Sequence, residues 1–189
     1  MQGDKRLLVI FAGSYSCPVV RGQVPIMLYL AQVWAHAVEF RFVYIAEAHA
    51  REEWPINNSR YNPEGGNIVV GQTQTSSDRC AAAKRFQAIF GIDTNALPMQ
   101  VDPPETNNFE TTFSPWPLRW FLVERGLEAG KPAVLLQKAL PFNGTYDFAE
   151  VDKLLRERCA DAPSIDAPPM PKVGELSKLC MRGKQPSSA

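Results

Sequence analysis

The sequence has no excess of either charge and no long apolar run. Its 189 residues include 20 Lys and Arg against 20 Asp and Glu, so the formal net charge is zero. Nucleic acids and anionic membranes are bound through many positive side chains, so neither is an expected partner. No stretch approaches the roughly 20 apolar residues that cross a bilayer, and no targeting peptide precedes the first predicted strand. We therefore expect a soluble, cytoplasmic protein.

Cysteine and histidine are also scarce. The chain has two histidines, and its four cysteines are Cys17, Cys80, Cys159 and Cys180. They form no CxxC pair and no spacing typical of metal ligands, which argues against a zinc site. A chain of this length with so few cysteines is not a disulfide scaffold. We expect no bound cofactor and no metal.

Cys17 has a chemically suggestive position. The apolar run 7–11 predicts a buried strand, and Pro18 suits the first position of the helix predicted to follow. Cys17 should then lie at a helix N-terminus, where the helix dipole favours a thiolate and lowers the pKa of the thiol. Arg21, four residues later, is placed to face the same sulfur. The pattern favours a nucleophile over the alternative, a packed structural thiol.

A carboxylate and an imidazole follow the second predicted strand, residues 40–46. Strand, helix and strand in succession predict a βαβ unit with parallel strands, whose carboxyl ends meet at one edge of the sheet. Ligands collect at this edge in such sheets. Cys17 follows the first strand, and Glu47 and His49 follow the second. We therefore expect these three side chains to lie close together.

The remaining pattern predicts an α/β fold with a mixed central sheet and helices on both sides. The expected elements are a long insertion over 50–75 beside the site, a helix capped by Ser76 or Ser77 and ended by Gly91, a strand over 97–102, a loop over 103–108, a hairpin of 118–124 with 133–137, and a last helix opened by a capping box of Asp147 and Glu150. Residues 1–158 form the predicted domain. Residues 159–189 are a proline-rich, disordered tail by composition.

This order resembles a thioredoxin fold with a long insertion after the second strand. A thiol sits at the first strand–helix junction, and Pro25 lies eight residues after it, inside the helix. Pro117 directly precedes the predicted hairpin, where thioredoxin-like proteins carry a cis-proline beside the active sulfur. We therefore predict that the Trp116–Pro117 bond is cis, a form found in about one X–Pro bond in twenty.

Two motifs resemble those of the iodothyronine deiodinase-like family. They are Gly-Ser-Tyr-Ser-Cys-Pro at 13–18 and Tyr-Ile-Ala-Glu-Ala-His at 44–49, the latter followed by Trp54-Pro55, and the likeness continues over most of 6–158. It implies a thiol-dependent oxidoreductase, related to selenoproteins, whose nucleophile is Cys17, often selenocysteine in that family. His49 would supply or relay a proton, and Glu47 would orient the imidazole or stabilise its charged form. Ser14, Ser16, Arg21 and Pro117 would be active-site neighbours.

The same resemblance implies a small-molecule substrate and an external thiol reductant. The reaction would be reductive dehalogenation or a related reduction of a soft electrophile, with a glutathione- or thioredoxin-like thiol restoring Cys17. Cys80 is an internal alternative as resolving thiol. The loop after Trp54 has no histidine, and Asn57, Asn58, Arg60 or Tyr61 would substitute for the one that holds the substrate phenol in the hormone enzymes.

Two other readings stay open. One is a peroxiredoxin-like peroxide reductase, since Ser14 stands three residues before Cys17 and Arg119 is available to support a peroxide. The other is a non-enzymatic thioredoxin-like binding module that holds a partner with its long loop and its tail. The sequence also leaves a homodimer open.

Overall fold

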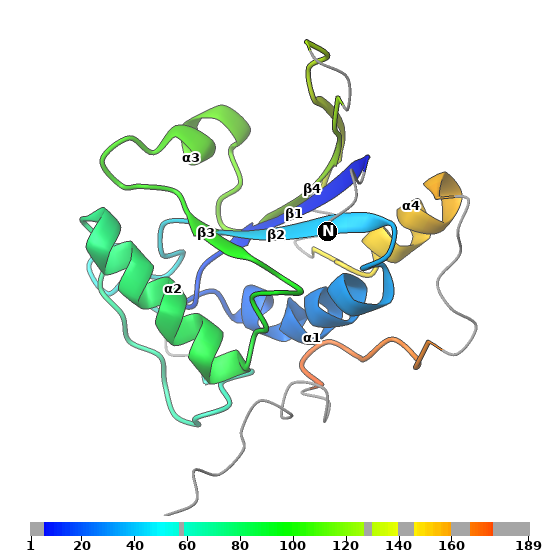
Figure 1. The fold of residues 1–189 in the computed structure, drawn as a ribbon. Helices are drawn as coiled ribbons and strands as arrows, with labels where there is room; N and C mark the ends of the chain where they lie inside the picture. The colour runs from blue at the N-terminus through cyan, green and yellow to red at the C-terminus, as the bar shows by residue number, and fades with distance from the viewer. Residues whose placement is uncertain (1–5, 57–58, 127–129, 140–145, 160–166, 176–189) are drawn as a thin grey trace, which may run out of the picture.

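The computed structural model describes residues 6–56, 59–126, 130–139, 146–159 and 167–175 (Figure 1). In chain order the elements are β1 Leu7–Gly13, α1 Pro18–Val33, β2 Val38–Tyr44, α2 Ser76–Phe90, β3 Met99–Val101, α3 Asn108–Phe113, β4 Arg119–Glu124, β5 Val134–Lys138 and α4 Glu150–Arg158. None of the described helices has the length and apolar character needed to cross a bilayer.

One sheet holds all these strands, in the order β3-β2-β1-β4-β5. β1 pairs parallel with β2, and β2 with β3, whereas β4 runs antiparallel to both β1 and β5. A parallel βαβ unit flanked by an antiparallel hairpin and a closing helix is the thioredoxin-like arrangement predicted from the sequence. The prediction of a mixed sheet with a β4–β5 hairpin is confirmed.

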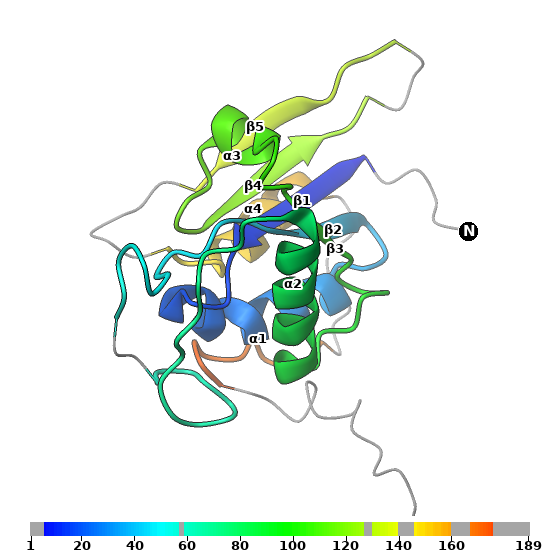
Figure 2. The same ribbon diagram turned by 90° about the vertical axis from the view of Figure 1, so that its left-hand side faces the viewer.

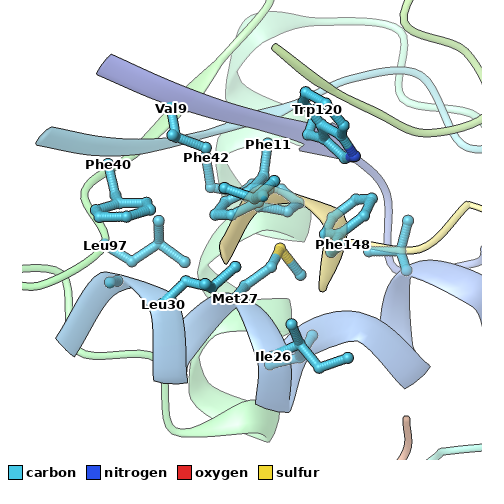
Figure 3. Close-up of a cluster of buried hydrophobic side chains, with 14 of the residues drawn as sticks. Val9, Phe11, Ile26, Met27, Leu30, Phe40, Phe42, Leu97, Trp120 and Phe148 are labelled. Carbon is cyan, nitrogen blue, oxygen red and sulfur yellow. The ribbon is translucent and has the colours of Figure 1, made fainter. Parts of the chain in front are cut away.

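Helices α1, α2 and α4 lie on one face of the sheet and the short α3 on the other (Figures 1 and 2). The main core lies under the first face, where alternate residues of the strands point toward α1, as strand geometry requires (Figure 3). Its buried members include Val9, Phe11, Phe40, Phe42, Trp120, Phe148, Met27 and Leu30. Burial of each such aliphatic or aromatic side chain contributes about 1.5–3 kcal/mol, so this layer fixes the frame on which the site is built.

Helix α3 is a correction to the sequence analysis, which expected only a loop after residue 103. The Asp102 carboxylate accepts hydrogen bonds from the main-chain N–H groups of Phe109 and Glu110, at 3.0 and 2.9 Å. Phe109 packs edge-on against Phe121 of β4. A six-residue helix has almost no intrinsic stability, so these tertiary contacts and not local propensity create it.

Two predicted helix caps also differ. Thr75, and neither Ser76 nor Ser77, caps α2, in a reciprocal capping box with Asp78. The capping box predicted at Asp147 is wrong: α4 begins at Glu150, and its N-cap residue makes no side-chain bond. The Asp147 carboxylate instead accepts from the N–H of Ala149, two residues on. Gly91 ends α2 in the left-handed conformation, as predicted.

Part of the predicted tail lies against α1. The N–H of Gly174 donates to the carbonyl of Gly22 at 2.7 Å, and Met170 packs on the main core. The ring of Tyr61 fills the space beside both glycines, so a Cβ at either position would collide with it. Residues 167–175 therefore contact the domain, unlike a disordered tail. The boundary at 158 stays a prediction, and residues 160–166 and 176–189 lie outside the described part of the chain.

Candidate active site

Cys17 is the N-cap residue of α1 and directly precedes Pro18, as predicted. Its N–H donates to the Ser14 carbonyl at 3.3 Å, which closes the tight turn between β1 and the helix. The side chain is a free thiol and only 2% exposed, packed at the margin of the main core. The sequence thus located the residue correctly but gave no sign of its burial.

The expected lowering of the Cys17 pKa is wrong. Burial raises the pKa of this thiol, and it does so against the opposing effect of the main-chain N–H groups of Val20 and Val19 and of the Arg21 charge. The helix terminus lowers the pKa, as predicted, but its effect is smaller than that of burial. The free energy needed to remove a thiolate from water exceeds the stabilisation that the helix dipoles provide. The resting site therefore holds a neutral thiol whose thiolate has hydrogen-bond donors ready.

Arg21 binds main-chain carbonyls around the site. Its side chain is fully buried, and Nη1 donates to the carbonyls of Tyr15 and Ser16 at 2.7 and 2.9 Å. Nε and Nη2 both donate to the carbonyl of Arg60, at 3.1 and 3.0 Å. The guanidinium thus joins the Cys17 loop to the long insertion, and its charge lowers the pKa of the Cys17 thiol against the larger effect of burial.

Glu47 is buried at 1% exposure and contacts the Cys17 loop. Its Oε2 accepts from the N–H of Ser16 at 3.0 Å, and its Oε1 accepts from the Tyr44 hydroxyl at 2.5 Å. The Tyr44 hydroxyl in turn accepts from the N–H of Tyr15. Burial raises the pKa of Tyr44 well above its usual range, and the neighbouring Glu47 charge adds to the effect.

The role expected of Glu47, to orient His49 or to stabilise its charged form, stays a prediction, since the partners of its oxygens are the Ser16 N–H and the Tyr44 hydroxyl. Both of its oxygens bind groups of the Cys17 loop and of β2. Tyr44, which joins the two, is predicted from the sequence as a strand residue and as the start of the 44–49 motif, with no role in the site. Its register opposite Gly13 in the parallel β1–β2 pair is the signal that places its side chain at this edge.

His49 lies beside the Cys17 loop. Its N–H donates to Ser16 Oγ at 3.1 Å, and the preceding N–H, that of Ala48, donates to Ser14 Oγ at 3.0 Å. The imidazole Nδ1 lies 3.1 Å from the Trp54 carbonyl oxygen. A carbonyl only accepts, so Nδ1 carries a proton and Nε2 is the nitrogen that can exchange one with a substrate. The two serines therefore fasten the His49 segment to the turn that carries the thiol.

Pro117 and Arg119 lie at the start of β4. The Trp116–Pro117 bond is cis, as predicted. Trp116 is 43% exposed and its ring centroid lies 6.4 Å from that of Trp54, which in turn meets the His49 ring edge-on at 5.7 Å. Arg119 donates to the carbonyls of Ser114 and Ala139, so its described bonds hold loops together and give no support to a peroxide-binding role.

A pocket of about 290 Å³ opens beside His49 within the predicted insertion. Its lining residues are His49, Arg51, Pro55, Ile56, Ile68 and Val69. Of the residues expected to replace a phenol-binding histidine, Tyr61 packs beside Gly22 of α1 and Arg60 lies over the Tyr61 ring, whereas Asn57 and Asn58 lie outside the described residues. The sequence predicted a loop beside the site but not which of its side chains form a pocket.

The other described cysteines, Cys80 of α2 and Cys159 at the end of α4, are half-buried. Cys180 lies outside the described residues, and Cys80 as a resolving thiol stays a prediction. Within the described residues, His, Cys, Asp and Glu nowhere gather in a group of three that could hold a metal ion.

Comparison with known proteins gives two results. Residues 1–155 match the protein family described as iodothyronine deiodinase. Type II iodothyronine deiodinase of Homo sapiens is 31% identical over 88 residues, and that of Sus scrofa 30%; each match covers 47% of this chain and 31% of the relative. The chain thus matches about a third of the length of these curated relatives.

Among solved structures, the exposed lipoprotein thioredoxin (Etrx1) of Streptococcus pneumoniae strain TIGR4 is 12% identical. It aligns with a TM-score of 0.47 over 81% of this chain and 85% of its own.

Proposed function

The chain belongs to the iodothyronine deiodinase family, and from this premise we propose that it is a thiol-dependent oxidoreductase. Its reaction would be reductive dehalogenation, or a related reduction of a soft electrophile. The observation that carries the proposal is the double attachment of Ser16, which precedes the thiol. Its N–H donates to Glu47 and its Oγ accepts from the main-chain N–H of His49, so the turn that carries the thiol is bonded to the segment that carries the imidazole.

The proposed reaction has two stages, reduction of the substrate by Cys17 and then reduction of the oxidised sulfur by external thiols. The Cys17 thiolate attacks the halogen of an aryl halide, forms a sulfur–halogen bond and breaks the carbon–halogen bond. The ring carbon keeps the electron pair and takes a proton from His49, so the substrate is reduced by two electrons and the sulfur is oxidised. A first external thiol displaces halide to give a mixed disulfide, and a second releases Cys17 and leaves as the oxidised disulfide.

His49 suits the proton-donor role through its hydrogen bond to Trp54. With Nδ1 bound to the Trp54 carbonyl, protonation of Nε2 gives an imidazolium whose Nε2–H can be donated to the substrate. Imidazole exchanges protons near neutral pH, which matches the need for an acid at the carbon left by the halogen.

The reductant is external in this proposal. A glutathione- or thioredoxin-like thiol would restore the sulfur, with Cys80 as the internal alternative for the resolving thiol, and the proposal uses no bound cofactor. A sulfur that is 2% exposed must become more accessible for this step, so motion of the surrounding loops is part of the proposal.

A second candidate, the non-enzymatic binding module, is favoured by that same burial, because a raised thiol pKa reduces the reactive thiolate at neutral pH. Iodide release from 3,5-diiodotyrosine and consumption of hydrogen peroxide, each with dithiothreitol, separate the candidates. We expect the wild-type chain and Cys80→Ser to release iodide and Cys17→Ser to release none. Peroxide consumption lost only in Cys17→Ser, with no iodide released, would identify a peroxide reductase. No difference between wild type and Cys17→Ser in either assay would leave the binding module.

A further inference from the structure

The pocket beside His49 is built from two segments of the insertion that are bonded to each other and to the site. The N–H of Arg51 donates to the Val70 carbonyl at 2.8 Å. Gln72, just beyond, accepts from the N–H of Glu47 and donates to its carbonyl, at 2.8 and 3.2 Å. The pocket walls are therefore fixed relative to the proposed catalytic groups, as a substrate subsite requires.

The lining of this pocket has a distinct chemistry. Pro55, Ile56, Ile68 and Val69 supply apolar walls, and Arg51 and His49 supply the polar groups. Apolar walls with few polar groups are typical of sites for small organic ligands. The walls favour a ring or a short aliphatic body, and the guanidinium favours an anionic group attached to it.

Arg51 is available to a ligand anion although it has a protein partner. Its Nη2 lies 3.0 Å from Glu52 Oε1, and the two side chains are 68% and 50% exposed. Ion pairs this exposed are weak, so a ligand carboxylate held against the apolar walls can replace Glu52 at the guanidinium. Glu52 remains satisfied after such an exchange, because its Oε2 also accepts from the N–H of Gln72.

The size of the pocket limits the ligand. A volume of about 290 Å³ lies just below the 300–1,000 Å³ that encloses drug-sized molecules. It accommodates one substituted ring better than the two linked rings of a thyronine.

We infer that this pocket is a subsite for a single-ring aromatic acid, which holds the ring between Ile56 and Ile68 and the carboxylate at Arg51. This inference rests on the proposed function, in which the ring would carry the halogen that Cys17 attacks. The protein would then prefer single-ring halogenated acids to thyronines. The charge of Arg51 and the small volume between the apolar walls set this preference.

Tryptophan fluorescence offers a direct binding signal. Trp54, which is 62% exposed, packs edge-on against the His49 ring at the margin of the pocket. Trp34 and Trp120 are at most 1% exposed, so an iodinated ligand at the pocket should quench mainly Trp54 and its neighbour Trp116. The Cys17→Ser chain is used throughout, because it cannot turn the ligand over.

The experiment titrates 3-iodo-4-hydroxybenzoate into Cys17→Ser and into three double variants that add Arg51→Gln, Arg6→Gln or Ile68→Trp. Arg6 is the matched control: it is 69% exposed and pairs with Glu124 at the opposite end of β1. We expect Arg51→Gln to raise Kd about tenfold, the size of a lost charge-assisted bond, and Arg6→Gln to leave it unchanged. Ile68→Trp, which fills the pocket, should abolish binding.

Three further ligands test the selectivity. 3-Iodophenol, which lacks the carboxylate, should bind more weakly and be insensitive to Arg51→Gln. 4-Hydroxybenzoate should compete with the iodinated acid, and 3,5-diiodothyronine should bind more weakly than the single-ring acid. Equal affinity of the Arg51→Gln and Arg6→Gln chains, or tighter binding of the thyronine, would overturn the inference. Because binding is measured without Cys17, absence of dehalogenation in the wild type would contradict the proposed function and leave this result intact.

Discussion

The main-chain N–H of Ser16 donates to the Glu47 carboxylate at 3.0 Å, and this bond joins the ends of the two central parallel strands. Glu47 is buried, so its negative charge is stabilised by the Ser16 N–H and by the Tyr44 hydroxyl that donates to its other oxygen. The pair therefore sets the position of the turn that carries Cys17 relative to the segment that carries His49.

Replacement of Glu47 by Gln should destabilise the protein. The amide nitrogen of Gln cannot accept, so one of the two donors, Ser16 N–H or Tyr44 hydroxyl, is left buried without a partner. The free energy of unfolding should fall by about 1–3 kcal/mol, measured by urea denaturation. Glu157→Gln, an exposed change on α4, is the matched control and should stay near wild type. Equal stability of the two variants would show that the Glu47 bonds contribute nothing.

The two histidines provide a matched pair for catalysis. His49→Gln removes the proposed acid and should reduce Cys17-dependent iodide release by about 10²–10⁴-fold, the usual contribution of a general acid. His36→Gln changes an exposed residue after α1 and should have no effect. Steady-state iodide release measures both. A His49→Gln chain as active as His36→Gln would remove His49 from the mechanism.

The raised pKa of Cys17 predicts how stability depends on pH. Above about pH 8.5 the thiol ionises in the unfolded chain but stays protonated in the folded one, so the folded state binds more protons. Stability should therefore be unaffected at low pH, begin to fall near the pKa of a free thiol, and lose this contribution fully above the folded pKa. Thermal unfolding of wild type and Cys17→Ser between pH 7 and 10 measures it, since the variant lacks the titration. Parallel curves would show that Cys17 ionises as readily folded as unfolded.

The contact between the C-terminal segment and Tyr61 can be tested at Gly174. Gly174→Ala should release residues 167–175 from α1, because the added Cβ collides with the Tyr61 ring. Gly130→Ala is the control: Gly130 also has a positive φ, at 82°, but no atom lies within 4 Å of the added Cβ. Hydrogen exchange over 167–175 should rise about tenfold or more only in Gly174→Ala, the change that 1.4 kcal/mol of lost contact gives. If both variants exchange like wild type, the contact does not hold the segment.

Features that depend on residues close in sequence could be predicted. The run after Arg6 becomes β1, Cys17 and Pro18 open α1, and Gly91 ends α2, because each follows from local periodicity or backbone preference. The contact between the Cys17 turn and the segment of Glu47 and His49 could also be predicted, since parallel strands bring their carboxyl ends together. The topology follows from the order of the elements alone, so the sequence could predict which segments meet at the site.

Features that depend on residues far apart in the sequence could not be predicted. The pKa of Cys17 is set mainly by burial, which arises from segments far along the chain, whereas the sequence displays only the helix terminus. Helix α3 exists because the Asp102 carboxylate binds its first N–H groups. The partners of Glu47 depend on where the Tyr44 hydroxyl points. In each case a tertiary contact, and not the local pattern, determines the outcome.

The attachment of residues 167–175 to α1 has a practical consequence for recombinant work. The family match ends at residue 155, so a truncation designed from homology would remove this segment. Such a shortened protein would leave Tyr61 uncovered on the side now occupied by Gly174 and would expose the core beneath Met170. Lower solubility or altered thiol reactivity in the truncated protein would then reflect the loss of this covering segment and not the intrinsic behaviour of the turn that carries Cys17.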